Sequence, residues 1–490
     1  MISPVKYLHE NHEYIIFEYS KRYFLFIVQF SGLFELSPDK IAAGEDFEGD
    51  TRLSAGLITE INRIIYAIRE EGLLTNKKAV ENESNRKMSV SALNLNLTPR
   101  CNLACVYCYA KGGDYERLDG DMKIETVMSA LRDAMPHIDG SREFRFEFFG
   151  GEPLLNIDTI GSVLDWEEKR AGAGSSIINR ISSNLTQYSG EVEDLFKRGN
   201  FILSISIDGG RETQNSQRPY RGGAGSYDDI IANAKAVKSK LPHLPLVARM
   251  TVYNNAHGLL DEIRELVAMN IFDYCSIYSA AIDDRGHGEV YMTDDFKKSF
   301  MDFAESYNEL LADKKNIFKG CLELNRYIGH ILNGTCAANH CRAGIGYFSL
   351  SPDGSVHPCH RLIGKPEFEI KGGFKNLDSV PGFWKTTVDM RERCSLCAIR
   401  YFCGGGCKQE ALISTGDPLG VSCKSCDFSR LLFDSALMAS IHLNGPALEK
   451  VRASSEKLSE MFVLCGQNVA ANGRNTFQDR LGHELKRFLL

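Results

Sequence analysis

Six short apolar segments alternate with stretches of helical spacing between residues 92 and 277, and this alternation restricts the folds open to the chain. The segments are rich in Ile, Leu, Val and Phe, and they span residues 92–97, 143–149, 176–182, 202–207, 246–252 and 271–277. Helical stretches such as 124–134 and 227–238 separate them. Strands that alternate with helices form parallel sheets. We therefore predict an α/β fold in which six strand–helix units curl into a partial (β/α)6 barrel.

Candidate functional residues follow these strands, where such a barrel gathers its active-site side chains. The first four strands are followed by the cysteine loop 101–108, Gly150-Gly151-Glu152-Pro153, Asn184 and Ser206-Ile207-Asp208-Gly209, and Arg249 lies near the end of the fifth. Taken alone, the glycines predict a turn and Glu152 a solvated helix start. Because they come one strand after a cysteine loop, we interpret them as part of a ligand site.

The loop 101–108 contains Cys101, Cys105 and Cys108 at C-x3-C-x2-C spacing. Three thiolates so close together can bind one 4Fe–4S cluster, whose fourth iron then stays open for a small chelating ligand. A structural zinc site is the alternative, but it usually takes four protein ligands that appear as two C-x2-C pairs. The spacing therefore favours an iron–sulfur cluster.

This loop resembles the signature of the radical S-adenosylmethionine (SAM) enzymes, in which the amine and carboxylate of SAM bind the open iron. The resemblance implies that a 5'-deoxyadenosyl radical, formed by reductive cleavage of SAM, abstracts hydrogen from a substrate. It also implies an electron donor such as flavodoxin or ferredoxin.

The same resemblance implies the contacts to SAM. Residues at the positions of Gly150, Gly151 and Glu152 bind the methionine amine, and glycines of this kind allow close backbone approach. The remaining implied contacts are Tyr107 near the adenine, and Asn184 and Ser206 facing the carboxylate or ribose. Arg249 is a candidate partner of the SAM carboxylate because guanidinium pairs with carboxylate bidentately, and Arg218 competes for that role.

A second group of cysteines begins beyond residue 335 and resembles the SPASM extension of radical SAM enzymes, which implies two further 4Fe–4S clusters. Its members are Cys336, Cys341, Cys359 (four residues after Gly354), Cys394, Cys397, Cys403, Cys407, Cys423 and Cys426. The implied ligands of the first auxiliary cluster are Cys341, Cys359 and Cys407, with Cys336 as the fourth. If Cys336 does not bind, the fourth iron either stays open for a substrate thiolate or is bound by Cys321. The implied ligands of the second are Cys394, Cys397, Cys403 and Cys426, with Cys423 as the alternative to Cys426. A zinc ribbon is the alternative for residues 394–407.

The residue after Cys359 bears on the product. Sulfatase-maturing relatives have an aspartate there that serves as a base, whereas this chain has Pro358-Cys359-His360. That segment resembles sactipeptide- and ranthipeptide-type maturases, which join a cysteine sulfur to a carbon atom in a ribosomally made peptide. His360 is then a candidate catalytic residue. The alternative is a structural role, in which its side chain packs in the core or caps a helix. The alternatives are a carbon–carbon crosslink, maturation of a protein active site, or, outside enzymes, a zinc-stabilised interaction module.

We divide the chain into an N-terminal α+β domain (1–88), the barrel (89–315), the SPASM domain (316–445) and a helical tail (446–490). The N-terminal domain is predicted from a strand hairpin, 13–19 and 23–30, and from helical spacing over 57–73. Its order and position resemble a peptide-recognition domain, in which a leader peptide adds a strand to a sheet edge. A cap without a ligand is the alternative. The polar run 77–87 is predicted to be a linker.

Composition excludes several partners. The net charge of -7 provides no basic field for nucleic acid. The N-terminus lacks a signal sequence and no apolar run is long enough for a bilayer, so we expect no membrane partner and a cytoplasmic location. Most of the 15 cysteines lie in short-spaced groups, which indicates metal ligation rather than disulfides. Cys275, Cys321 and Cys465 stand apart and are predicted to be buried as small apolar side chains.

Overall fold

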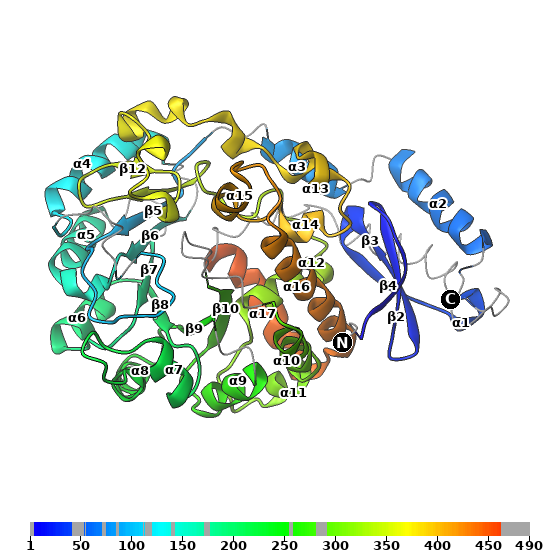
Figure 1. The fold of residues 1–490 in the computed structure, drawn as a ribbon, viewed down its shortest axis with the longest axis horizontal. Coiled ribbons are helices and arrows are strands. Elements are labelled where there is room, and N and C mark those ends of the chain that lie inside the picture. The colour runs from blue at the N-terminus through cyan, green and yellow to red at the C-terminus, as the bar shows by residue number, and fades with distance from the viewer. Residues whose placement is uncertain are drawn as a thin grey trace.

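The computed structural model describes residues 4–41, 53, 55–70, 75–84, 88–110, 112, 120–138, 143–170, 177–253, 258–280 and 292–461. Its centre is an eight-stranded sheet in the order β10-β9-β8-β7-β6-β5-β11-β12 (Figure 1). Six parallel neighbours in it are β5 (Ala92–Asn96), β6 (Phe144–Phe149), β7 (Ile177–Ser183), β8 (Phe201–Ser206), β9 (Leu246–Val252) and β10 (Tyr274–Ser279). The prediction of six parallel strands is confirmed, although β10 begins three residues later than expected.

Helices cover the outer side of this curved sheet (Figure 1). They are α4 (Ile124–Ala134), α5 (Ile157–Arg170), α6 (Gly190–Arg198), α7 (Arg211–Gln217), α8 (Tyr227–Lys240) and α9 (Leu259–Ala268), followed by α10 (Asp294–Glu305) and α11 (Tyr307–Ala312). Each long helix has an apolar stripe at helical spacing, as in α4, where Val127, Leu131 and Ala134 are buried. The apolar stripes pack on the outer face of the sheet. The polar loops that follow the carboxyl ends of the strands are therefore not covered by these helices.

Two further strands extend the barrel sheet beyond β5. Strand β11 (Tyr347–Leu350) pairs in parallel with β5, and β12 (Val356–His357) pairs antiparallel with β11. The sequence did not predict this pairing. It attaches the region of the second cysteine group directly to the edge of the barrel, next to the first cysteine loop.

The N-terminal region is a four-stranded antiparallel sheet. Its strands are β1 (Lys6–Glu10), β2 (Tyr14–Tyr19), β3 (Arg22–Ile27) and β4 (Gly32–Leu36). The predicted hairpin corresponds to β2 and β3, whose turn residues Ser20 and Lys21 have φ of 52° and 60°. Positive φ at both turn positions matches the twist of the flanking strands.

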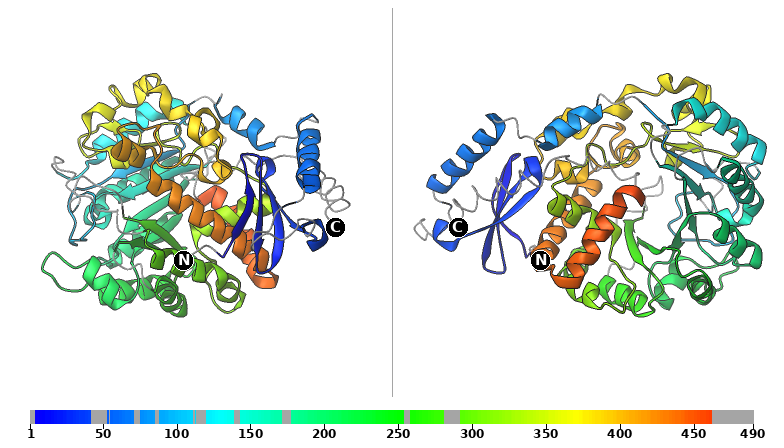
Figure 2. Two further views of the ribbon diagram at one scale, coloured as in Figure 1. Left: turned by 45° about the vertical axis from the view of Figure 1, so that its right-hand side comes forward. Right: turned by 180° about the vertical axis from the view of Figure 1, so that it is seen from behind.

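This N-terminal sheet is covered on both faces. Helices α1 (Pro38–Ile41) and α2 (Ala55–Glu70) pack on one face, where Ile61 and Ile65 are buried. The other face, with Phe24 and Phe26, joins the main core of the molecule. Figure 2 shows the sheet beside the long helix α16 (Cys423–His442).

The prediction of a linker over 77–87 is wrong for residues 77–84, which belong to helix α3 (Thr75–Ser84). Ala79 and Val80 are buried against the core, and the buried side chain of Asn76 donates to Val28 O at 3.0 Å. Two small apolar residues and one amide are enough to dock a polar helix. Residues 85–87 lie outside the described part of the chain.

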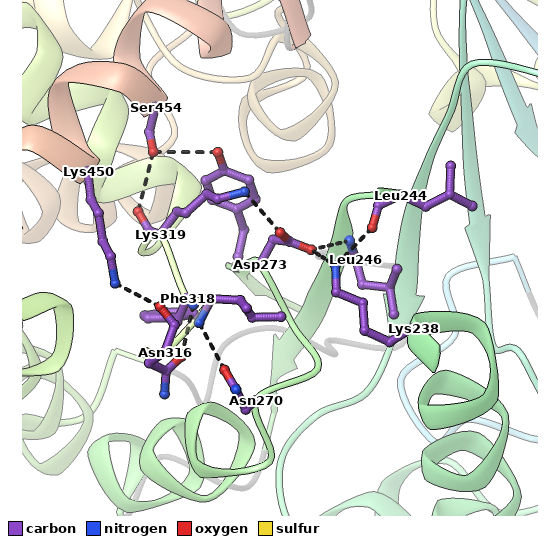
Figure 3. Close-up of polar contacts among 12 residues, drawn as sticks. Lys238, Leu244, Leu246, Asn270, Asp273, Asn316, Phe318, Lys319, Lys450 and Ser454 are labelled. Carbon is purple, nitrogen blue, oxygen red and sulfur yellow. Dashed lines mark hydrogen bonds and ion pairs between the residues drawn. The ribbon is translucent and has the colours of Figure 1, made fainter. Parts of the chain in front are cut away.

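The C-terminal region is built from helices α12 (Leu322–Asn333), α13 (Glu392–Ser395), α14 (Arg400–Cys403), α15 (Lys408–Thr415), α16 and α17 (Gly445–Met461). Lys450 of α17 donates to Asn316 O at 2.9 Å, and Ser454 to Lys319 O at 3.4 Å (Figure 3). Asp273, just before β10, accepts from Lys319 and from Lys238 of α8 (Figure 3). The first part of the predicted helical tail is therefore anchored to the barrel. Residues 462–490, with Cys465, lie outside the described residues.

Among the described residues, no helix has the length and apolar character that crossing a membrane requires.

Candidate active site

The cysteine loop follows β5 and is held from the other side of the barrel. Ala104 N donates to Pro219 O at 2.8 Å, and Val106 N donates to Gln217 O at 3.0 Å. Burial raises the pKa of the Cys101 thiol to about 12 and that of the Cys105 thiol to about 11, and neighbouring thiols add to both shifts. Thiols that lie close together in one loop suit metal ions, because bound iron stabilises the thiolate form. The donor set therefore fits the predicted cluster.

The glycine turn after β6 packs directly on this loop. Gly151 N donates to Thr98 O at 2.7 Å, and Glu152 N donates to Arg100 O at 2.8 Å. A Cβ on Gly150, where φ is 143°, would lie 2.6 Å from Thr98 O, and one on Gly151 would lie 2.6 Å from the Arg100 carbonyl carbon. Glycine is thus required for contact between the two loops, in addition to any approach to a ligand.

The carboxylate of Glu152 joins the ends of two strands. It is 1% exposed and accepts from Leu154 N at 3.1 Å, Ser183 Oγ at 2.7 Å and Asn184 N at 2.8 Å. Burial raises its pKa to about 7, although these donors oppose the shift. The side chain therefore orders the cavity wall, and its predicted contact with the SAM amine stays a prediction.

One cavity is lined by the three cysteines of the loop and by every residue predicted to contact SAM. Its lining includes Cys101, Cys105, Cys108, Tyr107, Gly150, Gly151, Glu152, Asn184, Ser206 and Arg249. The sequence analysis did not assign several other lining residues, among them Tyr109, Ser182, Thr251, Tyr278 and Arg361. The strand-end rule would have found Thr251 and Tyr278, whereas Arg361 comes from the second cysteine region and carried no local signal.

The guanidinium of Arg249 lies inside this cavity. It donates to Ser182 Oγ at 3.3 Å, and its Cζ lies 5.1 Å from the ring centroid of Tyr278 and 6.0 Å from that of Phe149. Burial lowers its pKa. No acidic side chain in the described ranges forms an ion pair with it. A buried cation in this position favours an anionic ligand.

Tyr107 takes part in a network with Asp208 and Arg218. Its hydroxyl donates to Asp208, which also accepts from Thr251 N at 2.8 Å and pairs with Arg218 Nε at 3.0 Å. The ring centroid of Tyr107 lies 5.7 Å from that of Tyr253. The predicted position of Tyr107 near adenine remains a prediction.

His360 lies at the start of a short 3-10 helix, His360–Leu362, just after β12. Its Nδ1 lies 2.7 Å from Tyr347 Oη, and its ring centroid lies 5.0 Å from that of Phe149. Burial lowers its pKa to about 3, and the positive charges of Arg361, Arg249 and Arg180 contribute to the shift. The lowered pKa favours the neutral imidazole, which contacts Tyr347 and Phe149.

Cys341, Cys359 and Cys407 lie close together in the second cysteine region. Burial raises the pKa of Cys359, and the nearby thiols of Cys407 and Cys341 raise it further. Arg361, which also lines the cavity, pairs with Glu410 at 3.1 Å and lies beside this group. Cys336 is fully buried, and its Sγ lies 4.0 Å from Asn76 O of α3.

Cys394, Cys397, Cys403 and Cys426 form another group. The pKa of Cys426 is raised to about 12, mainly by burial and in addition by the charges of the other three thiols. Cys423, in the same first turn of α16, is exposed, and so is the surface of Cys426; the two differ in that only Cys426 has the other three thiols as neighbours. Within the described chain, no three His, Cys, Asp or Glu side chains converge closely enough to bind a single metal ion.

Cys275 and Cys321, which stand apart from the cysteine groups, are buried, as predicted. Their backbones pair in a single parallel β-bridge.

Comparison with known proteins identifies the class. Residues 95–267, from β5 to α9, match the model of the Radical SAM superfamily. The chain therefore contains a radical SAM domain, which indicates an enzyme.

Relatives extend beyond this domain. A serine-type anaerobic sulfatase-maturating enzyme of Klebsiella aerogenes is 24% identical over 324 residues, which cover 63% of this chain and 77% of that protein. An uncharacterized protein of Methanocaldococcus jannaschii is 30% identical over 178 residues, which cover 36% of this chain and 58% of the relative.

Two solved structures share the fold. The structure of anSMEcpe with bound AdoMet has a TM-score of 0.62 at 19% identity and covers 75% of this chain and 98% of its own. Streptococcus suis SuiB bound to its precursor peptide SuiA has a TM-score of 0.53 at 13% identity and covers 82% of this chain and 96% of its own. The chain therefore shares its fold with these two structures.

Proposed function

We propose that this enzyme modifies a ribosomally made precursor peptide by joining a cysteine sulfur to a carbon atom. The observation that carries the proposal is the single cavity where the three-cysteine loop, the strand-end residues and Arg361 of the second cysteine region meet. When bound, a 4Fe–4S cluster and SAM would supply a 5'-deoxyadenosyl radical, formed by one-electron reductive cleavage, that abstracts hydrogen from the peptide.

The residues of this chain would bind and orient the reactants. Cys101, Cys105 and Cys108 would hold the cluster, and Arg249 would pair with the SAM carboxylate, since it has Ser182 and two aromatic faces as its other contacts. Phe149 and Tyr278 line the same cavity and would exclude water from the reacting atoms.

His360 supports thioether formation over sulfatase-type maturation, because the sulfatase-maturing family places an aspartate that serves as a base at this position and this chain does not. Burial lowers the pKa of the His360 imidazole, so this position holds a neutral group in place of a carboxylate. The second candidate is maturation of a protein active site, which the 324-residue match to a sulfatase-maturating enzyme favours. Both reactions would use the same cavity.

The second cysteine region would hold two more clusters. Cys341, Cys359 and Cys407 would ligate one, with Cys336 or a thiolate of the substrate as the fourth ligand, and the group of Cys394, Cys397, Cys403 and Cys426 would ligate the other. A low-potential carrier such as flavodoxin or ferredoxin would donate the electron.

The N-terminal sheet would bind the leader of the precursor peptide. β1 and β4 are its outer strands, and an extended peptide can add to such an edge. We infer a cytoplasmic location, where a precursor peptide and a reduced carrier are both present.

The first test is Cys105→Ala in anaerobically reconstituted enzyme. We expect production of 5'-deoxyadenosine to stop while the iron of the second region is retained, and we expect Cys423→Ala to change neither. Unchanged 5'-deoxyadenosine in Cys105→Ala would overturn the proposal.

The second test uses a small cysteine-bearing peptide encoded beside this gene. A thioether consumes one cysteine and two hydrogen atoms, so the product should lose one site of thiol alkylation in the mass spectrum. A product that keeps all its alkylation sites would indicate a carbon–carbon crosslink or another modification.

A further inference from the structure

We propose that Arg218 tunes the N-terminal cluster: its guanidinium, oriented by Asp208, donates toward the Cys105 sulfur and makes one-electron reduction of the cluster easier. This inference rests on the proposed function, because it concerns the cluster that Cys101, Cys105 and Cys108 would hold. It assigns Arg218 a positioning role that is separate from binding SAM.

The guanidinium is buried and contacts four groups. Arg218 is 8% exposed; its Nη1 lies 3.9 Å from Cys105 Sγ, its Nη2 donates to Thr251 Oγ1 at 3.2 Å, and its Nε pairs with Asp208 Oδ2 at 3.0 Å. Its Cζ lies 5.2 Å from the ring centroid of Tyr107. One edge of the planar group is therefore fixed by Asp208, and another is directed at the middle cysteine of the loop.

Asp208 is itself rigidly held. It is fully buried and accepts from Thr251 N and the Tyr107 hydroxyl, and its own backbone N donates to Gln214 Oε1 at 2.9 Å. Gln214 Nε2 donates to Ser226 Oγ at 3.1 Å, and Ser226 Oγ donates to Arg218 O at 2.7 Å. The network thus fixes both the backbone and the side chain of Arg218.

Reduction adds a negative charge to the cluster, and N–H donors aimed at its sulfur ligands stabilise that charge. Arg218 presents Nη1 at 3.9 Å from Cys105 Sγ, whereas Asp208 contacts the guanidinium at Nε. The positively charged group of the pair is therefore the one directed at the sulfur. The electron itself would come from the low-potential carrier.

The competing role is binding of the SAM carboxylate, since Arg218 also lines the cavity. The two roles differ without SAM present. A group that acts on the cluster changes the cluster's midpoint potential in SAM-free enzyme, whereas one that acts only on SAM changes the affinity for SAM alone.

The experiment is an EPR-monitored dithionite titration of reconstituted, SAM-free enzyme, with SAM affinity measured in parallel. In Arg218→Gln, we expect at least a tenfold lower ratio of reduced to oxidised N-terminal cluster at a fixed potential, which corresponds to a midpoint about 59 mV more negative. Arg221→Gln is the matched control, because Arg221 lies on the same loop but donates to the backbone oxygen of Cys101 at 2.7 Å. Its potential should equal that of the wild type.

An unchanged midpoint in Arg218→Gln, with weakened SAM binding, would overturn the inference and assign Arg218 to the carboxylate. If Arg218→Gln does not retain iron, Arg218→Lys decides: it keeps the charge but loses the planar group, so a more negative midpoint supports the inference and a wild-type midpoint overturns it. Failure of the proposed function would differ from both, because it would appear in the wild-type enzyme, either as no cleavage of SAM or as a peptide product that keeps all its alkylation sites.

Discussion

At the scale of single residues, the glycine pair illustrates how one motif can satisfy two requirements. The sequence indicated that Gly150 and Gly151 allow approach to a ligand. The structure shows that they also allow approach to residues 98–101, through hydrogen bonds from Gly151 N and Glu152 N. The cysteine loop therefore depends on a neighbouring turn for its position.

We predict that Gly151→Ala disturbs the cysteine loop. The added Cβ would meet the backbone of Arg100, which cannot move without displacing Cys101, and overpacking of this kind costs about 1–3 kcal/mol. The variant should unfold at a lower temperature and retain less iron at the N-terminal site. Gly190→Ala is the control, because a Cβ there meets no atom within 4 Å. Equal melting temperatures and iron contents in the two variants would contradict the prediction.

At the scale of elements, the barrel strands were predictable because each is an apolar run followed by polar residues. β1 and β4 were missed because they are short and only partly buried. β11 was missed because its partner β5 lies more than 250 residues earlier, and no local pattern reports so distant a pairing. Arg361 reaches the cavity only through that pairing, which explains why its position could not be inferred from the sequence.

The first turn of α16 provides a matched test of the second auxiliary site. Cys423 and Cys426 lie three residues apart, yet only Cys426 lies within the described group of Cys394, Cys397 and Cys403. We predict that Cys426→Ser loses about four irons per chain, as removal of one 4Fe–4S cluster requires. Cys423→Ser should keep the wild-type iron content. If only Cys423→Ser loses iron, Cys423 and not Cys426 is the cluster ligand.

At the scale of the whole molecule, the N-terminal sheet packs on the C-terminal region rather than on the mouth of the barrel (Figure 2). Phe26 contacts Phe402 and Phe433 edge to face, with ring centroids 5.6 and 5.2 Å away. Arg400 donates both to His12 O, at 2.8 Å, and to Cys397 O, at 2.9 Å. One side chain thus connects the β1–β2 turn to a predicted cluster ligand.

Arg430 forms a second connection. It pairs with Glu10 of β1, its Cζ lies 4.5 Å from the ring centroid of Tyr7, and its charge lowers the pKa of Cys397, which burial raises. Arg430 also lies one helical turn after Cys426. Binding of iron by the second group would therefore fix the positions of the residues on which the N-terminal sheet rests.

We predict that removal of iron loosens the N-terminal sheet. A chelated, iron-free sample should exchange the backbone amides of β1 and of the β1–β2 turn faster than the reconstituted enzyme, because Arg400 and Arg430 lose their fixed supports. Hydrogen–deuterium exchange with mass spectrometry measures this. Cys426→Ser should reproduce the increase while its N-terminal cluster remains intact, and Cys105→Ala, which spares the second group, should not. Equal exchange in β1 for all four samples would show that the sheet is held by its aromatic contacts alone, independently of iron.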